Sequence, residues 1–209
     1  HMKIILLACG SFSPPTFMHL RMLEMAREHM VALNHTVELG VLSPVNDKYP
    51  KPGLLKSHHR VEMCRLATIG SDWIKVWDYE ANQPEWTRTA LVIEQLEKEH
   101  QDAKVMLVAG ADMLESFNVS GLWSDEDIRF ILARGMIVIP RNRVDVEMAI
   151  LKNEHAFAHR SNIHIVPLIV ENNVSSTLIR LMIKRGLSIK YLVDDKVIDY
   201  IEKEGLYRL

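Results

Sequence analysis

The sequence predicts an α/β protein in which a mainly parallel, doubly wound sheet carries helices on both faces. Strand patterns alternate with helix patterns along the whole chain, which is typical of parallel strands joined by helices. Several strand stretches, such as 4–8 and 105–109, have no polar face, as expected for strands buried on both sides. We therefore expect a single domain over residues 3–209, with helices after the last strand. His1 and Met2 have the pattern of a cloning remnant.

The individual elements follow from apolar runs and from residues that favour helix ends. We expect strands over residues 4–8, 36–42, 74–77, 105–109, 136–139 and 163–166. We expect helices over residues 16–33, 57–69, 84–100, 125–134, 145–153 and 175–186, and from 194 onward. These helices open at capping or helix-starting residues, namely Thr16, Ser57, Pro84, Asp125, Asp145, Ser175 with Ser176, and Asp194. Gly135 and Gly186 are expected to end two of them.

In open parallel sheets, ligands bind beyond the carboxyl ends of the strands. The loops that follow the predicted strands are therefore the places to search, namely 10–19, 43–53, 78–86, 110–123, 140–143 and 171–180.

The composition limits the classes of partner. The chain has 209 residues, 48% of them apolar, and its 25 basic residues nearly balance 27 acidic ones. No basic field therefore points to nucleic acid, and a phosphate site has to be local. Cys9 and Cys64 lack metal-ligand spacing and are predicted to be reduced thiols. No apolar run reaches the roughly 20 residues of a membrane span.

The first candidate site is the turn after the first strand, Cys9-Gly10-Ser11, with the helix start that follows it. Unpaired amides at a helix N-terminus favour an anion. Thr16 and His19 lie three residues apart, so the imidazole can donate a hydrogen bond to a phosphate oxygen. The stretch has neither the Walker A nor the GxGxxG pattern. A tight structural turn with a capping Thr and a surface His remains an alternative.

The second candidate site is Asn172 to Arg180, where three hydroxyl residues precede a helix whose first turn carries the arginine. Amides and hydroxyls offer donors, and Arg180 can bind a phosphate in a bidentate manner. A Ser-rich cap with a solvent-facing Arg is the structural alternative. Two such helix starts in one α/β protein instead favour a site that grips a polyphosphate.

Together, GSFxPxTxxHL and SSTxxR resemble the (H/T)xGH nucleotidyltransferase superfamily, and more closely the eukaryotic nicotinamide mononucleotide adenylyltransferases. The similarity continues almost end to end, through SPVNDKY, HHRVEMCRLA, SDWI, GADMLESF, LWSDEDI, RSNIHIV and IKYLVDDKVIDYIEKEGLY. It implies a Rossmann-like fold and the transfer of AMP from ATP to nicotinamide mononucleotide, and also to nicotinate mononucleotide. The products are NAD or deamido-NAD and pyrophosphate. It further implies Mg²⁺ as cofactor and a homo-oligomer.

The resemblance also implies residue roles. His19 and Arg180 are the catalytic residues, and the ATP-binding set is Gly10, Ser11, Phe12, His19, Gly110, Asp112, Ser176, Thr177 and Arg180. The mononucleotide-binding set is Ser11, Phe12, Lys51, Trp86, Thr89, Leu122, Trp123, Arg141 and Asn172. Trp86 and Trp123 match the aromatic residues that hold the pyridine ring, although a Trp in a helix is often a core residue. Asp112 could equally cap a helix, and Lys51 could be a solvated charge.

The reaction chemistry agrees with these residues. A phosphate monoester is mostly a dianion at pH 7, so the attacking group needs no general base. The enzyme has to align this anion with the α-phosphorus of ATP and to neutralise charge on the leaving pyrophosphate. No carboxylate cluster suggests a protein cage, so we expect no metal ligands from the protein and Mg²⁺ held by phosphates and water. The pairs His58/His59 and His155/His159 are expected to be surface histidines.

The chain departs from the family pattern in three places. Met18 stands where the superfamily has Gly, and the loop at Lys51 has prolines where relatives carry several lysines. The connection 100–104 lacks the hydrophilic insertion of larger animal relatives, which removes the usual place for a nuclear signal. We expect an intracellular protein, with cytoplasm, nucleus and mitochondrion all open. The rival functions are a sibling nucleotidyltransferase with another phosphorylated acceptor and a nucleotide-binding, chaperone-like protein without turnover.

Overall fold

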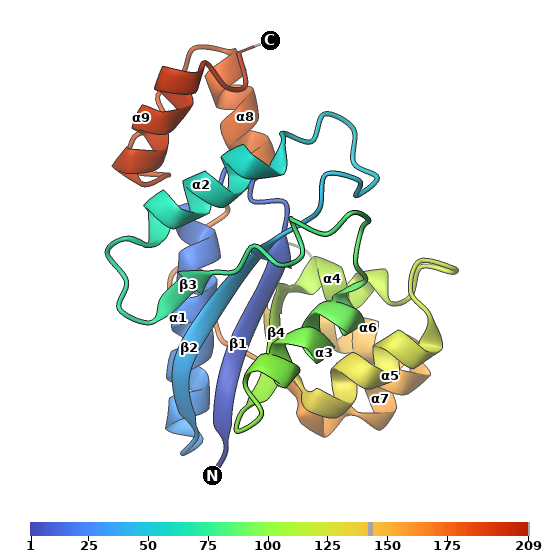
Figure 1. The fold of residues 1–209 in the computed structure, drawn as a ribbon. Helices are drawn as coiled ribbons and strands as arrows, with labels where there is room; N and C mark the ends of the chain where they lie inside the picture. Colours follow the sequence, from blue (N-terminus) through green and yellow to red (C-terminus); the bar gives the residue numbers. More distant parts are fainter. Residues whose placement is uncertain (142–143, 209) are drawn as a thin grey trace. The chain divides into compact units, whose positions relative to one another are not determined.

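A computed structural model describes residues 1–141 and 144–208 of the chain. Within these residues one sheet has the strand order β3-β2-β1-β4-β5-β6 (Figure 1). Its strands are β1 Lys3–Gly10, β2 Thr36–Pro44, β3 Ile74–Val76, β4 Lys104–Gly110, β5 Met136–Ile139 and β6 Ile163–Ile165. The pairs β1–β4, β4–β5 and β5–β6 are parallel. Because β1 lies inside the sheet and later strands extend it in both directions, the predicted doubly wound α/β fold is confirmed.

The helices alternate with the strands as predicted. They are α1 Phe17–Ala32, α2 Ser57–Thr68, α3 Thr89–Glu99, α4 Ala111–Ser116, α5 Asp125–Arg134, α6 Val146–Lys152, α7 Glu154–Ala158, α8 Ser176–Lys184 and α9 Asp195–Glu204, with a 3-10 turn η1 at Arg160–Asn162. The short helices α4 and α7 were not predicted from the sequence. Of the predicted starts, Ser175, Asp145 and Asp194 do cap their helices, each accepting a hydrogen bond from a backbone N–H of the first turn.

The helix predicted from Pro84 is wrong in its first turns, because α3 begins only at Thr89. The segment before it is a folded loop held by contacts from elsewhere in the chain. The Asn46 amide donates to the carbonyls of residues 80, 81 and 83, at 3.3, 3.4 and 2.6 Å. These bonds hold the backbone of residues 80–83 in a folded loop, and the chain bends at Pro84 instead of starting a helix there.

The predicted cap at Ser57 is also wrong, since Ser57 is the first residue of α2 and Lys56 occupies the N-cap position. The capping group comes from ten residues earlier. The carboxylate of Asp47 accepts the Ser57 N–H at 2.6 Å. A carboxylate at this end of a helix also interacts favourably with the helix dipole.

The described chain divides into two compact units, and the prediction of a single domain stays a prediction. The first unit comprises residues 1–9, 22–40 and 88–171. Its core joins β4 and β5 to the helices α4 to α7, with Leu114, Ile128, Leu132 and Val138 among its buried residues. Figure 1 shows α3, α5 and α7 lying close together in this unit.

The second unit comprises residues 10–21, 41–87 and 172–209. Its apolar core joins α2, α8 and α9 through Met63, Ile179, Val197 and Ile201, all nearly inaccessible to solvent. Gly205 ends α9 with a φ of 63°, a left-handed conformation that glycine adopts without strain. The three segments of this unit include both motifs predicted to bind phosphates.

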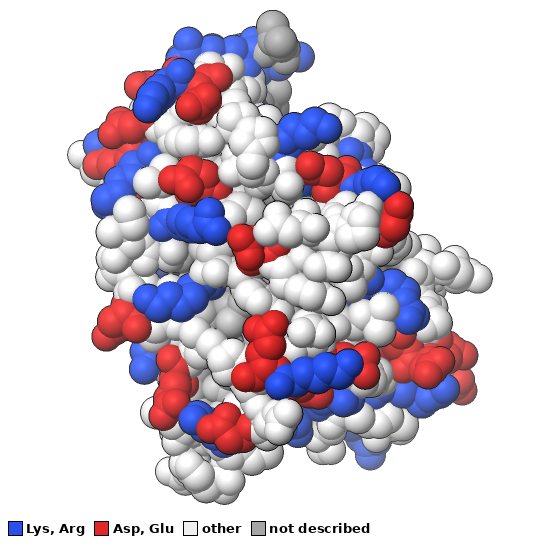
Figure 2. All heavy atoms as spheres, viewed as in Figure 1, with Lys and Arg blue, Asp and Glu red and all other residues white. Residues whose placement is uncertain are grey.

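Charged side chains of both signs are interspersed on the face seen in Figure 2. This matches the near balance of 25 basic and 27 acidic residues in the sequence. None of the helices in the described ranges combines the length and the apolar character that crossing a membrane requires.

Candidate active site

The turn after β1 has a backbone shape that its residue types explain. Phe12 has a φ of 49°, in the left-handed region, which costs an L-residue roughly 1–2 kcal/mol. Its ring is 3% exposed and meets the His19 ring edge to face, with 5.0 Å between the centroids. A side chain at Gly10 would place its Cβ 3.4 Å from the Phe12 ring, in van der Waals contact. The buried Phe12 ring therefore folds back over Gly10, the last residue of β1.

The hydrogen bonds of His19 fix which ring nitrogen carries the proton. The backbone N–H of Thr16 donates to Nδ1 of His19 at 2.9 Å, and the Thr16 hydroxyl lies 3.3 Å from the same atom. Since Nδ1 accepts, the neutral imidazole carries its hydrogen on Nε2. The ring can then act as a neutral donor from Nε2, as the sequence predicts for a phosphate contact.

The second motif contacts this turn directly. Arg180 donates from Nη1 to the carbonyl of Ser13 at 2.9 Å and from Nη2 to the Thr177 hydroxyl at 3.4 Å. The Ser176 hydroxyl donates to the carbonyl of Pro14 at 2.7 Å. The two motifs, about 160 residues apart in sequence, thus meet within the second unit. The hydroxyl of Ser176 already donates its hydrogen to Pro14. The predicted contact between Ser176 and ATP would therefore use the backbone N–H of Ser176 as the donor.

Three cations converge on the same turn. Lys51 donates to the Ser11 hydroxyl at 3.3 Å. Partial burial lowers the pKa of Lys51, and the nearby positive charges of Arg180 and Arg60 lower it further. Like charges gathered in this way repel one another, and a bound polyanion relieves that repulsion.

Arg60 is a residue that the sequence analysis did not assign. Its side chain is fully buried, and Nη1 donates to the carbonyl of Ser11 at 3.0 Å. Nη2 donates to the Val45 carbonyl at 2.7 Å and to the Asp47 carboxylate at 3.1 Å. The arginine therefore supports the turn from the protein interior. The available signal was its position four residues before Cys64, on the buried stripe of α2.

The loop between β3 and α3 presents Trp86, which is 45% exposed. The structural alternative of a core tryptophan in a helix is therefore wrong for this residue. Its ring contacts the Tyr49 ring edge to face, with 5.5 Å between the ring centroids. Asn172, also predicted to contact the mononucleotide and also in this unit, lies in the loop before α8 and accepts the Val174 N–H at 3.0 Å.

The first unit holds the remaining predicted residues. Gly110 ends β4 and occupies the N-cap position of α4, so Asp112 lies in the first turn and does not cap the helix. Trp123 is half-buried, donates from Nε1 to the Ser116 hydroxyl at 3.0 Å and packs edge to face on Phe117. The others in this unit are Thr89 at the start of α3, the exposed Leu122, and Arg141 just after β5. Asn142 and Arg143, which complete the predicted loop 140–143, lie outside the described residues.

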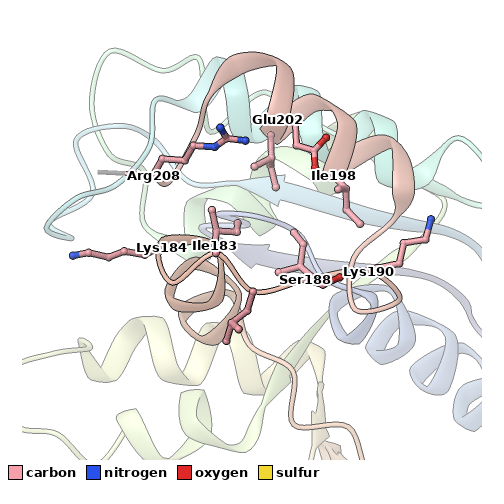
Figure 3. A pocket seen from close by; sticks show the side chains of 11 residues that line it. Ile183, Lys184, Ser188, Lys190, Ile198, Glu202 and Arg208 are labelled. Atoms are coloured by element: carbon pink, nitrogen blue, oxygen red, sulfur yellow. Dashed lines mark hydrogen bonds between the residues drawn. The ribbon is translucent and has the colours of Figure 1, made fainter.

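One pocket of the second unit lies away from the residues predicted to bind the substrates. A pocket of about 750 Å³ in the second unit lies between α8 and α9, over an apolar floor that includes Ile183 and Ile198 (Figure 3). Lys184, Lys190 and Arg208 are on its rim. None of the predicted site residues lines this pocket. The phosphate-binding candidates are identified by their donors and by the contacts between their motifs.

The chain matches the family model described as cytidylyltransferase-like over residues 7–182. The chain belongs to this family. Within the family it is 42% identical to the nicotinamide/nicotinic acid mononucleotide adenylyltransferase of Arabidopsis thaliana, over 98% of this chain and 90% of that protein. The corresponding protein of Bos taurus, numbered 1, is 40% identical, with 98% and 89% covered. For the Schizosaccharomyces pombe relative, at 40% identity, the chain spans 60% of that protein's length.

Solved structures support the fold of this cytidylyltransferase-like chain. The Plasmodium falciparum nicotinic acid mononucleotide adenylyltransferase complexed with NaAD superimposes with a TM-score of 0.75. It covers 98% of this chain and 97% of its own, at 21% identity. The resemblance stated from the motifs, to eukaryotic adenylyltransferases of this kind, is confirmed by the sequence relatives.

Proposed function

We propose that the chain transfers the AMP moiety of ATP to nicotinamide mononucleotide, and also to nicotinate mononucleotide, giving NAD or deamido-NAD and pyrophosphate. The observation that carries this proposal is the contact between the two phosphate motifs, in which Arg180 and Ser176 bond the turn that contains Ser11 and Phe12. The relatives of about 40% identity, which carry this activity in their names, support the same conclusion.

In this mechanism the mononucleotide phosphate attacks the α-phosphorus of ATP in line, and pyrophosphate leaves. The amides of Gly10 to Phe12 and the Nε2–H of His19 hold the triphosphate, and the neutral ring adds a donor without needing to lose a proton. Arg180 has five N–H donors, and its two bonds within the protein leave others to grip the leaving phosphates. Lys51 adds charge on the same side. The rate gain comes from alignment and charge neutralisation, since the nucleophile is already ionised.

Mg²⁺ fits this site only as a companion of the nucleotide. The residues proposed to bind the phosphates supply an imidazole, hydroxyls and cations. In addition, no group of three His, Cys, Asp or Glu side chains within residues 1–141 and 144–208 could hold a metal ion. Phosphate oxygens and waters would therefore be the main ligands. When bound, the ion neutralises charge on the phosphates.

For the acceptor, Trp86 and Trp123 supply aromatic faces for the pyridine ring, with Thr89, Leu122, Arg141 and Asn172 as further contacts. Gly110 and Asp112 bind ribose. The homo-oligomer implied by the resemblance belongs to the proposal as well, and light scattering of the purified protein at micromolar concentration tests it.

The decisive experiment measures pyrophosphate release from ATP with no acceptor, with nicotinamide mononucleotide, with nicotinate mononucleotide, and with a phosphorylated acceptor that lacks a pyridine. The expected result is release only with the two pyridine mononucleotides, together with a dinucleotide product identified by mass. Release that is independent of the mononucleotide, preference for the other acceptor, or no release with Mg²⁺ present would each refute the proposal.

A further inference from the structure

A tyrosine after the last helix reaches the turn between the two phosphate motifs. Tyr207 follows α9 with a φ of 64°, and its hydroxyl lies 2.8 Å from the hydroxyl of Ser13. The preceding Leu206 anchors this segment, because it is 7% exposed in the core of α2, α8 and α9, and its N–H donates to the Ile201 carbonyl at 3.0 Å. The position of the Tyr207 hydroxyl is therefore set by the core of the second unit.

Ser13 links the two motifs that are proposed to bind the phosphates. Its carbonyl accepts the bond from Arg180 at 2.9 Å, and its side chain is almost fully buried at 3% exposure. It directly follows Phe12, whose ring packs on the His19 ring. A shift of Ser13 thus displaces the guanidinium acceptor and the Phe12–His19 contact together, because all of them belong to one short turn.

We propose that Tyr207 is a positioning residue for nucleotide transfer, whose hydroxyl holds Ser13 in place and through it the Arg180 guanidinium. This deepens the proposed function and rests on it. Tyr207 acts through Ser13 rather than on the reacting atoms. Burial raises the pKa of the Tyr207 phenol, so the hydroxyl is neutral throughout the working range and the bond does not switch with pH near neutrality.

Substitution of Tyr207→Phe tests this directly, because it keeps the ring and removes only the hydroxyl. Loss of one buried hydrogen bond predicts that kcat falls roughly fivefold, while KM for the mononucleotide stays within about twofold. Ser13→Ala removes the other partner, and the double variant is expected to be no worse than the poorer single variant, since both changes delete the same bond.

Tyr200→Phe is the matched control. Tyr200 lies in α9 and its hydroxyl is 2.7 Å from Nδ1 of His59, so this change also removes one tyrosine hydroxyl bond in the same segment. It leaves the Ser13 turn untouched, and kcat is expected to match the unsubstituted protein. Thermal unfolding of both variants shows whether any rate loss only follows stability. Equal kcat losses in both variants, an unchanged kcat in Tyr207→Phe, or additive effects in the Ser13/Tyr207 double variant would overturn the proposal.

A binding measurement separates this inference from the proposed function. Calorimetric titration with a non-hydrolysable ATP analogue, without any acceptor, is expected to show a several-fold weaker Kd for Tyr207→Phe and an unchanged Kd for Tyr200→Phe. If the protein binds ATP but uses another acceptor, the proposed function fails while this result still supports Tyr207. If the unsubstituted protein binds no ATP, both proposals fall. An unchanged Kd in Tyr207→Phe together with a normal kcat refutes the role of Tyr207 alone.

Discussion

The buried carboxyl of Glu80 makes the stability of the second unit depend on pH. Glu80 is 3% exposed in the loop that carries Trp86, and its Oε2 accepts the Ser43 hydroxyl at 2.8 Å. Burial raises the pKa of this carboxyl from 4.5 to about 7, although the Ser43 bond and the charge of Arg60 pull it back. The folded protein therefore holds the proton of Glu80 at pH values where the unfolded chain has released it.

The size of the effect follows from this shift. Each pKa unit corresponds to 1.36 kcal/mol, so the free energy of unfolding should fall by about 3 kcal/mol as pH rises from the unfolded pKa to the folded one. The sign is fixed because the folded state binds more protons in this window. The contribution of Glu80 to the free energy of unfolding is fully present below about pH 4.5 and is fully lost above about pH 7.

Glu80→Gln removes the titration while keeping the shape and an acceptor for Ser43. We expect urea unfolding at pH 5, 6, 7 and 8 to show that the free energy of unfolding of the variant rises relative to that of the unsubstituted protein, by up to about 3 kcal/mol over this range. Glu85→Gln is the control, since Glu85 lies in the same loop but is exposed and paired with Lys48. Its curve should run parallel to that of the unsubstituted protein. A parallel curve for Glu80→Gln, or a difference that grows toward low pH, would refute the reasoning.

Three further outcomes are expected. His19→Ala should lower kcat by about 100-fold or more, because it removes a donor to the phosphates, with little change in thermal stability; near-normal turnover would make His19 structural. Trp86→Ala should raise KM for the mononucleotide more than KM for ATP in steady-state assays, and equal effects would make the exposed ring a packing residue. Burial and then His29 lower the pKa of His164, so the contribution of His164 to the free energy of unfolding should be lost as pH drops below about 6.5, opposite in sign to that of Glu80; the difference in urea stability between His164→Gln and the unsubstituted protein should shift in favour of the variant as pH falls.

Local patterns predicted the parts of the fold whose causes are local. The strands at 4–8 and 105–109 are buried on both faces, and an apolar run is all that such a strand needs. Ser175 caps α8 through a bond to an amide three residues away, which a short window of sequence can reveal. The predicted start of α3 was wrong because its cause is not local. The loop before it is held by Asn46, about 40 residues earlier, and no window around Pro84 contains that information.

The same distinction applies to the site. His19 and Arg180 could be predicted as phosphate-binding residues because each lies in a motif whose chemistry shows in a few neighbouring residues, and their roles stay predictions. Tyr207 was not named, because its contact is with Ser13 in another segment, and for Arg60 the sequence offered only its spacing from Cys64, while its partner Ser11 also lies in another segment.

The second unit is assembled from three separate stretches of chain, residues 10–21, 41–87 and 172–209. During synthesis the turn at Ser11 leaves the ribosome long before α8 and Tyr207 exist. The bonds that Arg180 and Tyr207 make to Ser13 are then missing, so the proposed triphosphate site is incomplete in the nascent chain. The ATP binding proposed for these motifs should therefore appear only after α8 and Tyr207 have been synthesised, and a product cut short before α8 should lack it.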